Sequence, residues 1–172
     1  LLPPLLPTII VDLGMTTLTA GLALGALQAV YALTQFPSGR LSDRFTRPSL
    51  VVPGLITLVG AFLLLSIATS AWVFVAATLA IGVGKGLFAV PSRAQLSDLF
   101  VEKRGRALGL YAAGTDLGGI LASVGGVVAT GGAAALVWPG ADLSLPAVGW
   151  RDPFVPVAVV LALVAVAYVV WN

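Results

Sequence analysis

Gly39-Arg40-Leu41-Ser42-Asp43-Arg44-Phe45-Thr46-Arg47-Pro48 is a ten-residue stretch that holds three arginines and one aspartate. It lies between two long runs, residues 13–39 and 48–84, that contain no charged residue. A dense charge cluster between two such runs is typical of a tight turn outside the hydrocarbon core of a lipid bilayer. We therefore expect the chain to leave a membrane here and to re-enter it.

The composition of the whole chain also indicates a membrane protein. Of its 172 residues, 59% are hydrophobic and only 9% are charged, and the mean hydropathy is +1.06. A soluble domain carries about 25% charged residues. The net charge is +2, but the basic residues cluster at turns and form no continuous stripe, which argues against nucleic-acid binding.

The sequence contains no cysteine and no histidine. A disulfide framework, a thiolate or histidine metal site and a serine–histidine nucleophile pair are therefore excluded within it. We expect no cofactor and no bound metal. No spacing of the remaining polar residues assembles a nucleophile with a base, so the sequence does not predict an enzyme.

A membrane-spanning helix needs about 20 mostly apolar residues, because each residue adds about 1.5 Å to a helix that crosses about 30 Å of hydrocarbon. By this measure we expect an all-α, polytopic transmembrane bundle that forms a single domain over residues 1–172. Residues 1–11 are expected to be the outer end of an earlier helix, which predicts that the sequence is a fragment. The five complete spans predicted are 16–37, 49–69, 72–90, 105–129 and 153–171, with cytoplasmic loops 38–48 and 91–104 and an outer loop 130–152.

The distribution of lysine and arginine predicts the orientation. Three basic residues fall in loop 38–48 and four lie in or directly after loop 91–104, whereas the opposite side has only Arg151. Because loops rich in lysine and arginine stay in the cytoplasm, we expect both loops and the C-terminus to be cytoplasmic, in the plasma membrane. The seven basic residues are Arg40, Arg44, Arg47, Arg93, Lys103, Arg104 and Arg106.

Two charges are predicted inside the membrane. Lys85 follows Trp72 by 13 residues, about 20 Å along its helix, and Asp116 follows Arg106 by 10 residues, about 15 Å. Their depths agree, so we expect Lys85 and Asp116 to face each other between the predicted spans 72–90 and 105–129. These spans would be the fourth and fifth helices when a missing first helix is counted. A charge in a bilayer is costly and is usually functional or paired. Substrate or proton handling, a purely structural pair and snorkelling of Lys85 to the headgroups all remain open.

A weaker polar strip lies in the span 16–37, where Gln28 and Gln35 are seven residues apart and Tyr31 lies between them. Gln28 and Tyr31 are secondary candidates for a transport pathway. The alternative for Gln28 is a structural role, because glutamine side chains in a span also form hydrogen bonds between helices. Gly21 and Gly25 in this span, and the glycines of the span 105–129, have spacings that predict close helix packing.

The opening stretch resembles the signature loop of the major facilitator superfamily, in which a glycine is followed by an acidic–basic pair and further basic residues. Gly39, Asp43, Arg44 and Arg47 match that pattern, whereas Thr46 replaces its second glycine. Residues 91–110 resemble the family's link between its fourth and fifth helices, and residues 149–154 resemble the entry to its sixth. In effect the chain resembles the amino-terminal half of such a transporter, without most of the first helix.

This resemblance implies a gate on the cytoplasmic side, where the loop latches two halves of a transporter together. Its expected members are Gly39, where backbones would touch, Asp43, which would cap a helix start, Arg44, Arg47 and Asp98. We expect Asp98 to be the local partner of Arg44. Two departures weaken an expectation of proton/drug antiport: Thr78 stands where proton-coupled members often carry arginine, and Ala122-Ser123 where drug antiporters often carry Gly-Pro.

The resemblance implies secondary active transport of a small solute by alternating access. The expected partners are the lipid bilayer, a missing C-terminal half, a small-molecule substrate and a coupling ion such as a proton. The alternative is a non-transporting membrane scaffold or an orphan fragment. A reading frame that continued into six more spans would favour transport.

Overall fold

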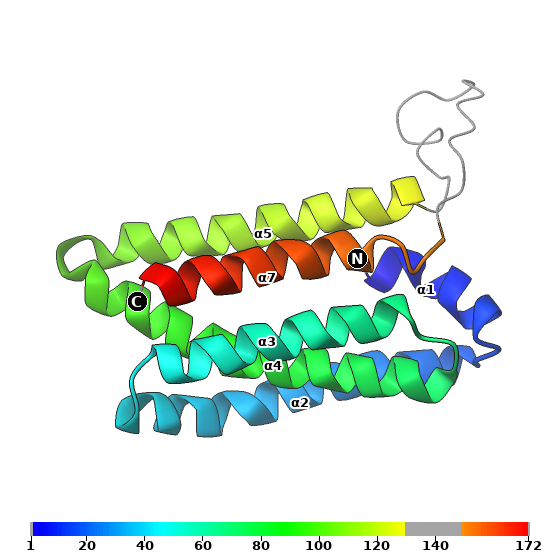
Figure 1. Ribbon diagram of the computed structural model, residues 1–172, viewed down its shortest axis with the longest axis horizontal. Coiled ribbons are helices and arrows are strands. Elements are labelled where there is room, and N and C mark those ends of the chain that lie inside the picture. The colour runs from blue at the N-terminus through cyan, green and yellow to red at the C-terminus, as the bar shows by residue number, and fades with distance from the viewer. Residues whose placement is uncertain (1, 130–148, 172) are drawn as a thin grey trace.

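The computed structural model describes residues 2–129 and 149–171, and every regular element in these two ranges is a helix (Figure 1). This confirms the prediction of an all-α bundle. The helices are α1 (Leu2–Asp12), α2 (Thr17–Arg44), α3 (Pro48–Ser66), α4 (Ala71–Leu99), a 3₁₀ turn η1 (Val101–Lys103), α5 (Arg104–Ala129) and α7 (Phe154–Trp171).

Five helices in the described ranges are long and apolar enough to cross a membrane, as the sequence predicted: α2, α3, α4, α5 and α7. Local residues explain where two of them begin. Thr16 precedes α2 and its hydroxyl accepts a hydrogen bond from the Thr19 amide at 3.1 Å, while Ser70 does the same before α4 for Val73. Such hydroxyls satisfy amides that have no partner within the first turn of a helix.

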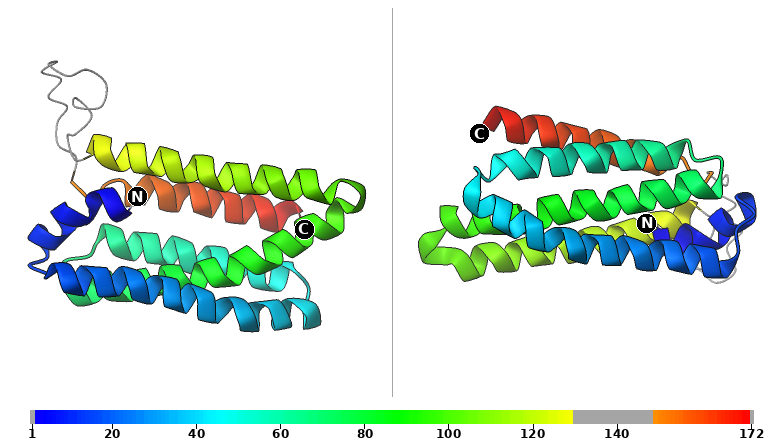
Figure 2. Two further views of the ribbon diagram at one scale, coloured as in Figure 1. Left: turned by 180° about the vertical axis from the view of Figure 1, so that it is seen from behind. Right: turned by 90° about the horizontal axis from the view of Figure 1, so that it is seen from below.

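Helix α4 is the centre of the packing. It lies against α2 and α3, and α7 packs on the far side of α3 (Figure 2, right). Helix α5 touches α4 and α1 over much shorter lengths. Open space therefore remains beside α5, and the candidate site lies in that space.

Glycines on α3 and α4 allow the close approach at the centre of the bundle. A Cβ atom on Gly86 would lie 2.5 Å from Cβ of Thr34 on α2, and one on Gly54 of α3 would lie 2.9 Å from the amide nitrogen of Phe88 on α4. No side chain fits at such distances, so glycine is required where these helices cross.

The described residues do not show the predicted close packing at other glycines. Side-chain carbons placed at Gly21, Gly25 or the α5 glycines from Gly105 to Gly119 would have no neighbour within 4 Å among the described residues. Spacing alone does not show which face of a helix meets a neighbour, and these glycines lie on faces that no other described element covers.

The apolar core lies toward the end of the bundle that carries α1, opposite the turn between α2 and α3 (Figure 1). Phe154 at the start of α7 is fully buried there, with its ring centroid 6.1 Å from that of Phe62 and 6.2 Å from that of Trp150. Aromatic contacts of this kind add to the stabilisation from burial itself. Other fully buried members of this core are Leu5, Ile9, Leu65 and Phe74.

Two helices continue beyond the predicted ends of their spans, into the stretches predicted as cytoplasmic loops. Helix α2 continues through Pro37 to Arg44, and α4 continues through Pro91 to Leu99, so most of 38–48 and much of 91–104 is helical. A proline removes one backbone donor and strains the preceding turn, but later residues keep their bonds. The Phe45 amide, for example, still donates to the carbonyl of Leu41 at 2.8 Å. The charged stretch is thus mainly the last turns of a helix.

The chain reverses direction after α1 at Gly14, whose φ of +59° is the left-handed conformation that glycine adopts readily. The Met15 amide donates to the carbonyl of Ile10 at 3.0 Å and closes the end of the helix. Residues 1–11, predicted to belong to a helix, fall almost wholly within α1. The predicted outer loop 130–152 lies mostly outside the described residues.

Candidate functional site

All four residues predicted for the transport pathway line two adjoining cavities, and Lys85 lines both. The larger cavity has a volume of about 880 Å³ and includes Gln28. The smaller, of about 590 Å³, includes Tyr31 and Asp116. Residues from α2, α4 and α5 that are up to 88 positions apart in the sequence therefore meet around one lysine.

The larger cavity is mainly apolar. It extends between α2, α4 and α7, and residues of α1 and α5 also contribute to its lining. A cavity of this size with few polar groups is suited to an apolar or amphipathic small molecule. Its side chains include Leu24, Leu27, Phe62, Ile81 and Leu161, with Gln28 and Lys85 as the polar members.

The smaller cavity is more polar and lies between α4 and α5, with Tyr31 contributed by α2. Two cations, Lys85 and Arg93, and one anion, Asp116, line it together with the hydroxyl-bearing residues Tyr111 and Thr115. The ionised side chains leave an excess of one positive charge. This cavity can therefore receive a hydrogen-bond acceptor or an anionic group.

The ammonium of Lys85 lies over the ring of Tyr31, 4.8 Å from its centroid. This cation–π contact is possible because Gly86, the next residue on α4, lets α2 approach closely. A cation held against an aromatic face is stabilised without a carboxylate partner. Tyr31 thereby positions Lys85 at the junction of the two cavities.

Lys85 and Asp116, which were predicted to face each other, form no direct ion pair. Both residues line the smaller cavity, but none of the ion pairs within 4.0 Å in the described ranges joins them. The depth estimate placed them near the same level, whereas α5 makes only a short contact with α4. The cavity occupies the space between their helices.

Arg93 belongs to the smaller cavity, although the sequence analysis placed it in a cytoplasmic loop. It lies on α4, eight residues after Lys85, and its Nε donates to the carbonyl of Ala89 at 2.8 Å. Residues eight apart on a helix share a face, so the spacing from Lys85 was the signal that could have identified it. Tyr111 and Thr115, four residues apart on α5, share a face with each other, but their spacings of five and one from Asp116 gave no such signal.

A second group of charges surrounds Arg47, in the turn between α2 and α3. Its guanidinium lies 3.2 Å from Oδ2 of Asp98 at the end of α4 and 3.5 Å from Oδ1 of Asp43. It also donates to the carbonyl of Ser42 at 3.1 Å and to the Ser42 hydroxyl. This side chain thus satisfies a carbonyl in the last turn of α2, where helices lack internal donors.

Two expectations for this group were wrong. Asp98 pairs with Arg47 and not with Arg44, which is exposed and pairs with no carboxylate in the described part of the chain. Arg47 follows the turn, so it can reach both the end of α2 and the end of α4. Gly39 was expected to let backbones touch, but a Cβ atom there would meet Val90 at an ordinary 3.7 Å.

A third group lies at the opposite end of the bundle and was not predicted as a set. Asp12 accepts hydrogen bonds from Nε1 of Trp150 at 3.1 Å and from Arg151 at 2.7 Å, and Arg151 also donates to the carbonyl of Ala68 at 2.8 Å. The bonds from Trp150 and then from Arg151 lower the pKa of Asp12. The group connects the end of α1, the α3–α4 connection and the start of α7.

Comparison with known proteins gives one family and a set of relatives. The family profile described as Major Facilitator Superfamily matches residues 1–172. The proteins named "Multidrug resistance protein MdtH" of Yersinia pestis (strain Pestoides F) and Yersinia pseudotuberculosis serotype O:3 (strain YPIII) are each 30% identical to the chain over 156 residues. The match covers 89% of this chain and 39% of each relative. No solved structure gives a significant match.

Proposed function

This chain belongs to the major facilitator superfamily, and we propose that it forms one wall of a secondary active transporter that moves a small solute by alternating access. It spans 39% of the length of the curated relatives it matches. A second helical half would supply the opposing wall of the substrate cavity, as expected for a fold in which two halves rock around a central site. Transport is proposed for that whole assembly.

The observation that carries this proposal is the meeting of Gln28, Tyr31, Lys85 and Asp116 around two cavities that share Lys85. Ionisable residues in membrane spans usually face a cavity or a partner and serve a function. Here Lys85 has a cavity on each side and no carboxylate partner among the described residues. A structural lysine would more commonly be neutralised by an acidic neighbour.

We infer that the substrate is an amphipathic molecule of drug-like size. Its apolar body would occupy the larger cavity, whose volume of about 880 Å³ falls within the range typical of ligand sites. An acceptor or anionic group would lie at Lys85. The name of the relatives, multidrug resistance protein, supports this substrate class. Asp116, which lines the polar cavity, is the proposed carrier of a coupling proton.

We propose that the group around Arg47 forms part of a cytoplasmic gate in the plasma membrane, with the C-terminus also cytoplasmic. The distribution of basic residues supports this orientation. Basic residues concentrate at the end of the bundle that carries the α2–α3 turn and the α4–α5 connection, and such concentrations stay in the cytoplasm. The remaining exposed members, Asp43 and Arg44, are available to the second half.

The test is transport by the protein, expressed from its natural reading frame and reconstituted in proteoliposomes, with a fluorescent amphipathic dye. Lys85→Gln should lower the initial rate about tenfold, whereas Arg104→Gln, which changes a basic residue outside both cavities, should retain it. A wild-type protein that is folded and binds the dye but moves none of it would support the scaffold alternative. Equal rates for Lys85→Gln and wild type would remove Lys85 from the pathway.

A further inference from the structure

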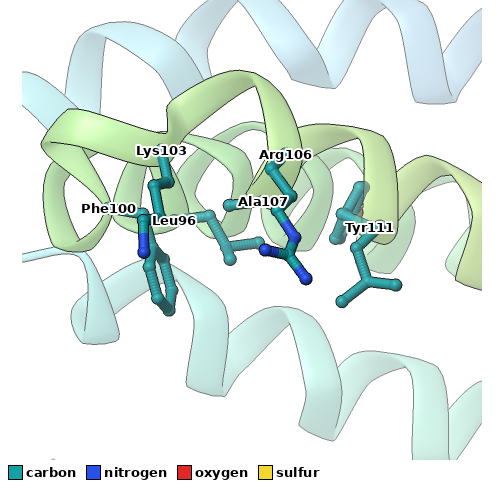
Figure 3. A pocket seen from close by; sticks show the side chains of 7 residues that line it. Leu96, Phe100, Lys103, Arg106, Ala107 and Tyr111 are labelled. Atoms are coloured by element: carbon teal, nitrogen blue, oxygen red, sulfur yellow. The ribbon is translucent and has the colours of Figure 1, made fainter.

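A separate groove lies where α4, η1 and α5 meet, with a volume of about 490 Å³ (Figure 3). Among the residues that line this groove, Tyr111 also lines the smaller of the two cavities at Lys85, and the others line neither cavity. Its apolar lining comes from Leu96, Phe100, Ala107, Leu110 and Tyr111, and Lys103 and Arg106 complete it. The proposed transport pathway therefore leaves this groove unexplained.

The two basic residues of the groove are Lys103 and Arg106. Lys103 and Arg106 form no ion pair with any residue that the structure describes, and Glu102 does not line the groove. Arg104, between them in sequence, instead donates its Nε to the carbonyl of Ser97 at 2.9 Å. Two cations thus remain at a groove whose other lining is apolar, and this arrangement is complementary to an anion that carries a hydrocarbon tail.

The surface next to the groove is also apolar. Phe100 is 49% exposed and Leu110 is 74% exposed, and Leu99 and Val101 beside them are similarly uncovered. Figure 3 shows Phe100 and Lys103 at one end of the groove and Tyr111 at the other, with the Arg106 side chain between them. Apolar surface directly beside cations is typical of a protein segment at the boundary between acyl chains and headgroups.

We propose that this groove binds an anionic phospholipid of the cytoplasmic leaflet. The lipid phosphate would lie between Lys103 and Arg106, and an acyl chain would follow the apolar lining toward Leu110. Basic grooves between spans on the cytoplasmic side are suited to anionic headgroups because that leaflet carries the anionic lipids. The proposal rests on the orientation proposed above, but it needs neither substrate nor transport.

The experiment is native mass spectrometry of the full-length protein in detergent, titrated with dioleoylphosphatidylglycerol or, for comparison, dioleoylphosphatidylcholine. The double variant K103Q/R106Q should bind phosphatidylglycerol about 30-fold more weakly, which corresponds to about 2 kcal/mol at about 1 kcal/mol per basic residue. Binding of phosphatidylcholine should not change. The control R104Q alters a neighbouring arginine outside the groove and should retain phosphatidylglycerol; an equal loss in R104Q would overturn the proposal.

A second variant separates the groove from general surface charge. Ala107→Phe keeps both cations but fills the apolar lining, so it should weaken phosphatidylglycerol binding about tenfold while the protein keeps its melting temperature. Unchanged binding would contradict a seated acyl chain. Millimolar inorganic phosphate should leave the lipid bound, and its complete displacement would show a site for free anions instead. Because binding is measured directly, a failure of the transport proposal would not affect this result.

Discussion

Arg47 and Asp98 are 51 residues apart in sequence, and their side chains form an ion pair at 3.2 Å that joins the α2–α3 turn to the last turn of α4. Arg47 is the centre of this group, because its side chain contacts Asp43, Ser42 and Asp98 together. The charged stretch that resembles the family signature is therefore already anchored to α4 within this chain, through an arginine that the sequence analysis assigned no partner.

Replacing the two partners should have unequal effects on stability. Asp98→Asn removes a half-exposed ion pair and should lower the free energy of unfolding by less than about 1 kcal/mol. Arg47→Gln also leaves the carbonyl and hydroxyl of buried Ser42 without their donor, so it should cost about 1–3 kcal/mol. Unfolding in detergent followed by circular dichroism measures both. Arg44→Gln is the control, and a larger loss for Asp98→Asn than for Arg47→Gln would contradict the assignment.

Gly86 should tolerate no side chain. Gly86→Ala places a methyl group 2.5 Å from a side-chain carbon of Thr34, so α2 and α4 must separate, at a cost of about 1–3 kcal/mol. Gly114→Ala is the matched control in α5, where nothing lies within 4 Å among the described residues. It should stabilise by up to about 1 kcal/mol through helix propensity. Melting temperatures that shift equally would show that the α2–α4 contact is looser than the structure has it.

Lys85 and Asp116 should be energetically independent in folding, since the structure shows no ion pair between them. In a double-mutant cycle of Lys85→Gln and Asp116→Asn, the coupling in the free energy of unfolding should be below about 0.5 kcal/mol. Unfolding of the two single variants and the double variant measures it. A coupling above about 1 kcal/mol would favour the structural pair that the sequence analysis left open.

The Asp12 group should make stability depend on pH in the acid range. Hydrogen bonds from Trp150 and Arg151 lower the pKa of Asp12 from its ordinary 3.8, so its contribution is fully present above that value. It is lost as the pH falls through the lowered, folded-state pKa. The melting-temperature difference between wild type and Asp12→Asn should therefore be constant near neutral pH and shrink below pH 3.8. Trp150→Phe, which removes one donor but keeps a buried ring, should reduce this pH dependence in part.

Asp43 should matter to transport far more than to folding. Its side chain is 77% exposed and its ion pair with Arg47 is 3.5 Å long, so Asp43→Asn should change stability by less than about 0.5 kcal/mol. If Asp43 closes a gate against a second half, the transport rate should fall about tenfold at equal surface expression. Undiminished transport by a correctly inserted variant would exclude this gate.

The membrane helices could be predicted from the sequence because each depends on a property of its own stretch. Residues 49–69 and 153–171 are continuous apolar runs of the length a bilayer requires, and α3 and α7 lie there within a few residues. The ends beyond Pro37 and Pro91 could not be placed in this way. Hydropathy marks where a chain enters water, whereas a helix ends where its hydrogen bonds end, at Phe45 and Phe100.

For the candidate site, too, local properties could be predicted from the sequence, whereas contacts between helices could not. The sequence by itself determined that Lys85 and Asp116 belong to apolar stretches long enough to span a membrane and that residues 39–48 form a charged cluster, because hydropathy and charge are local quantities. Only the tertiary structure decided that Lys85 meets Tyr31, that Arg47 and not Arg44 meets Asp98, and that Arg93 faces the cavity. Those contacts depend on how the helices are rotated and shifted against one another. Packing between distant segments sets these positions, for example where Gly54 and Gly86 let neighbouring helices approach closely.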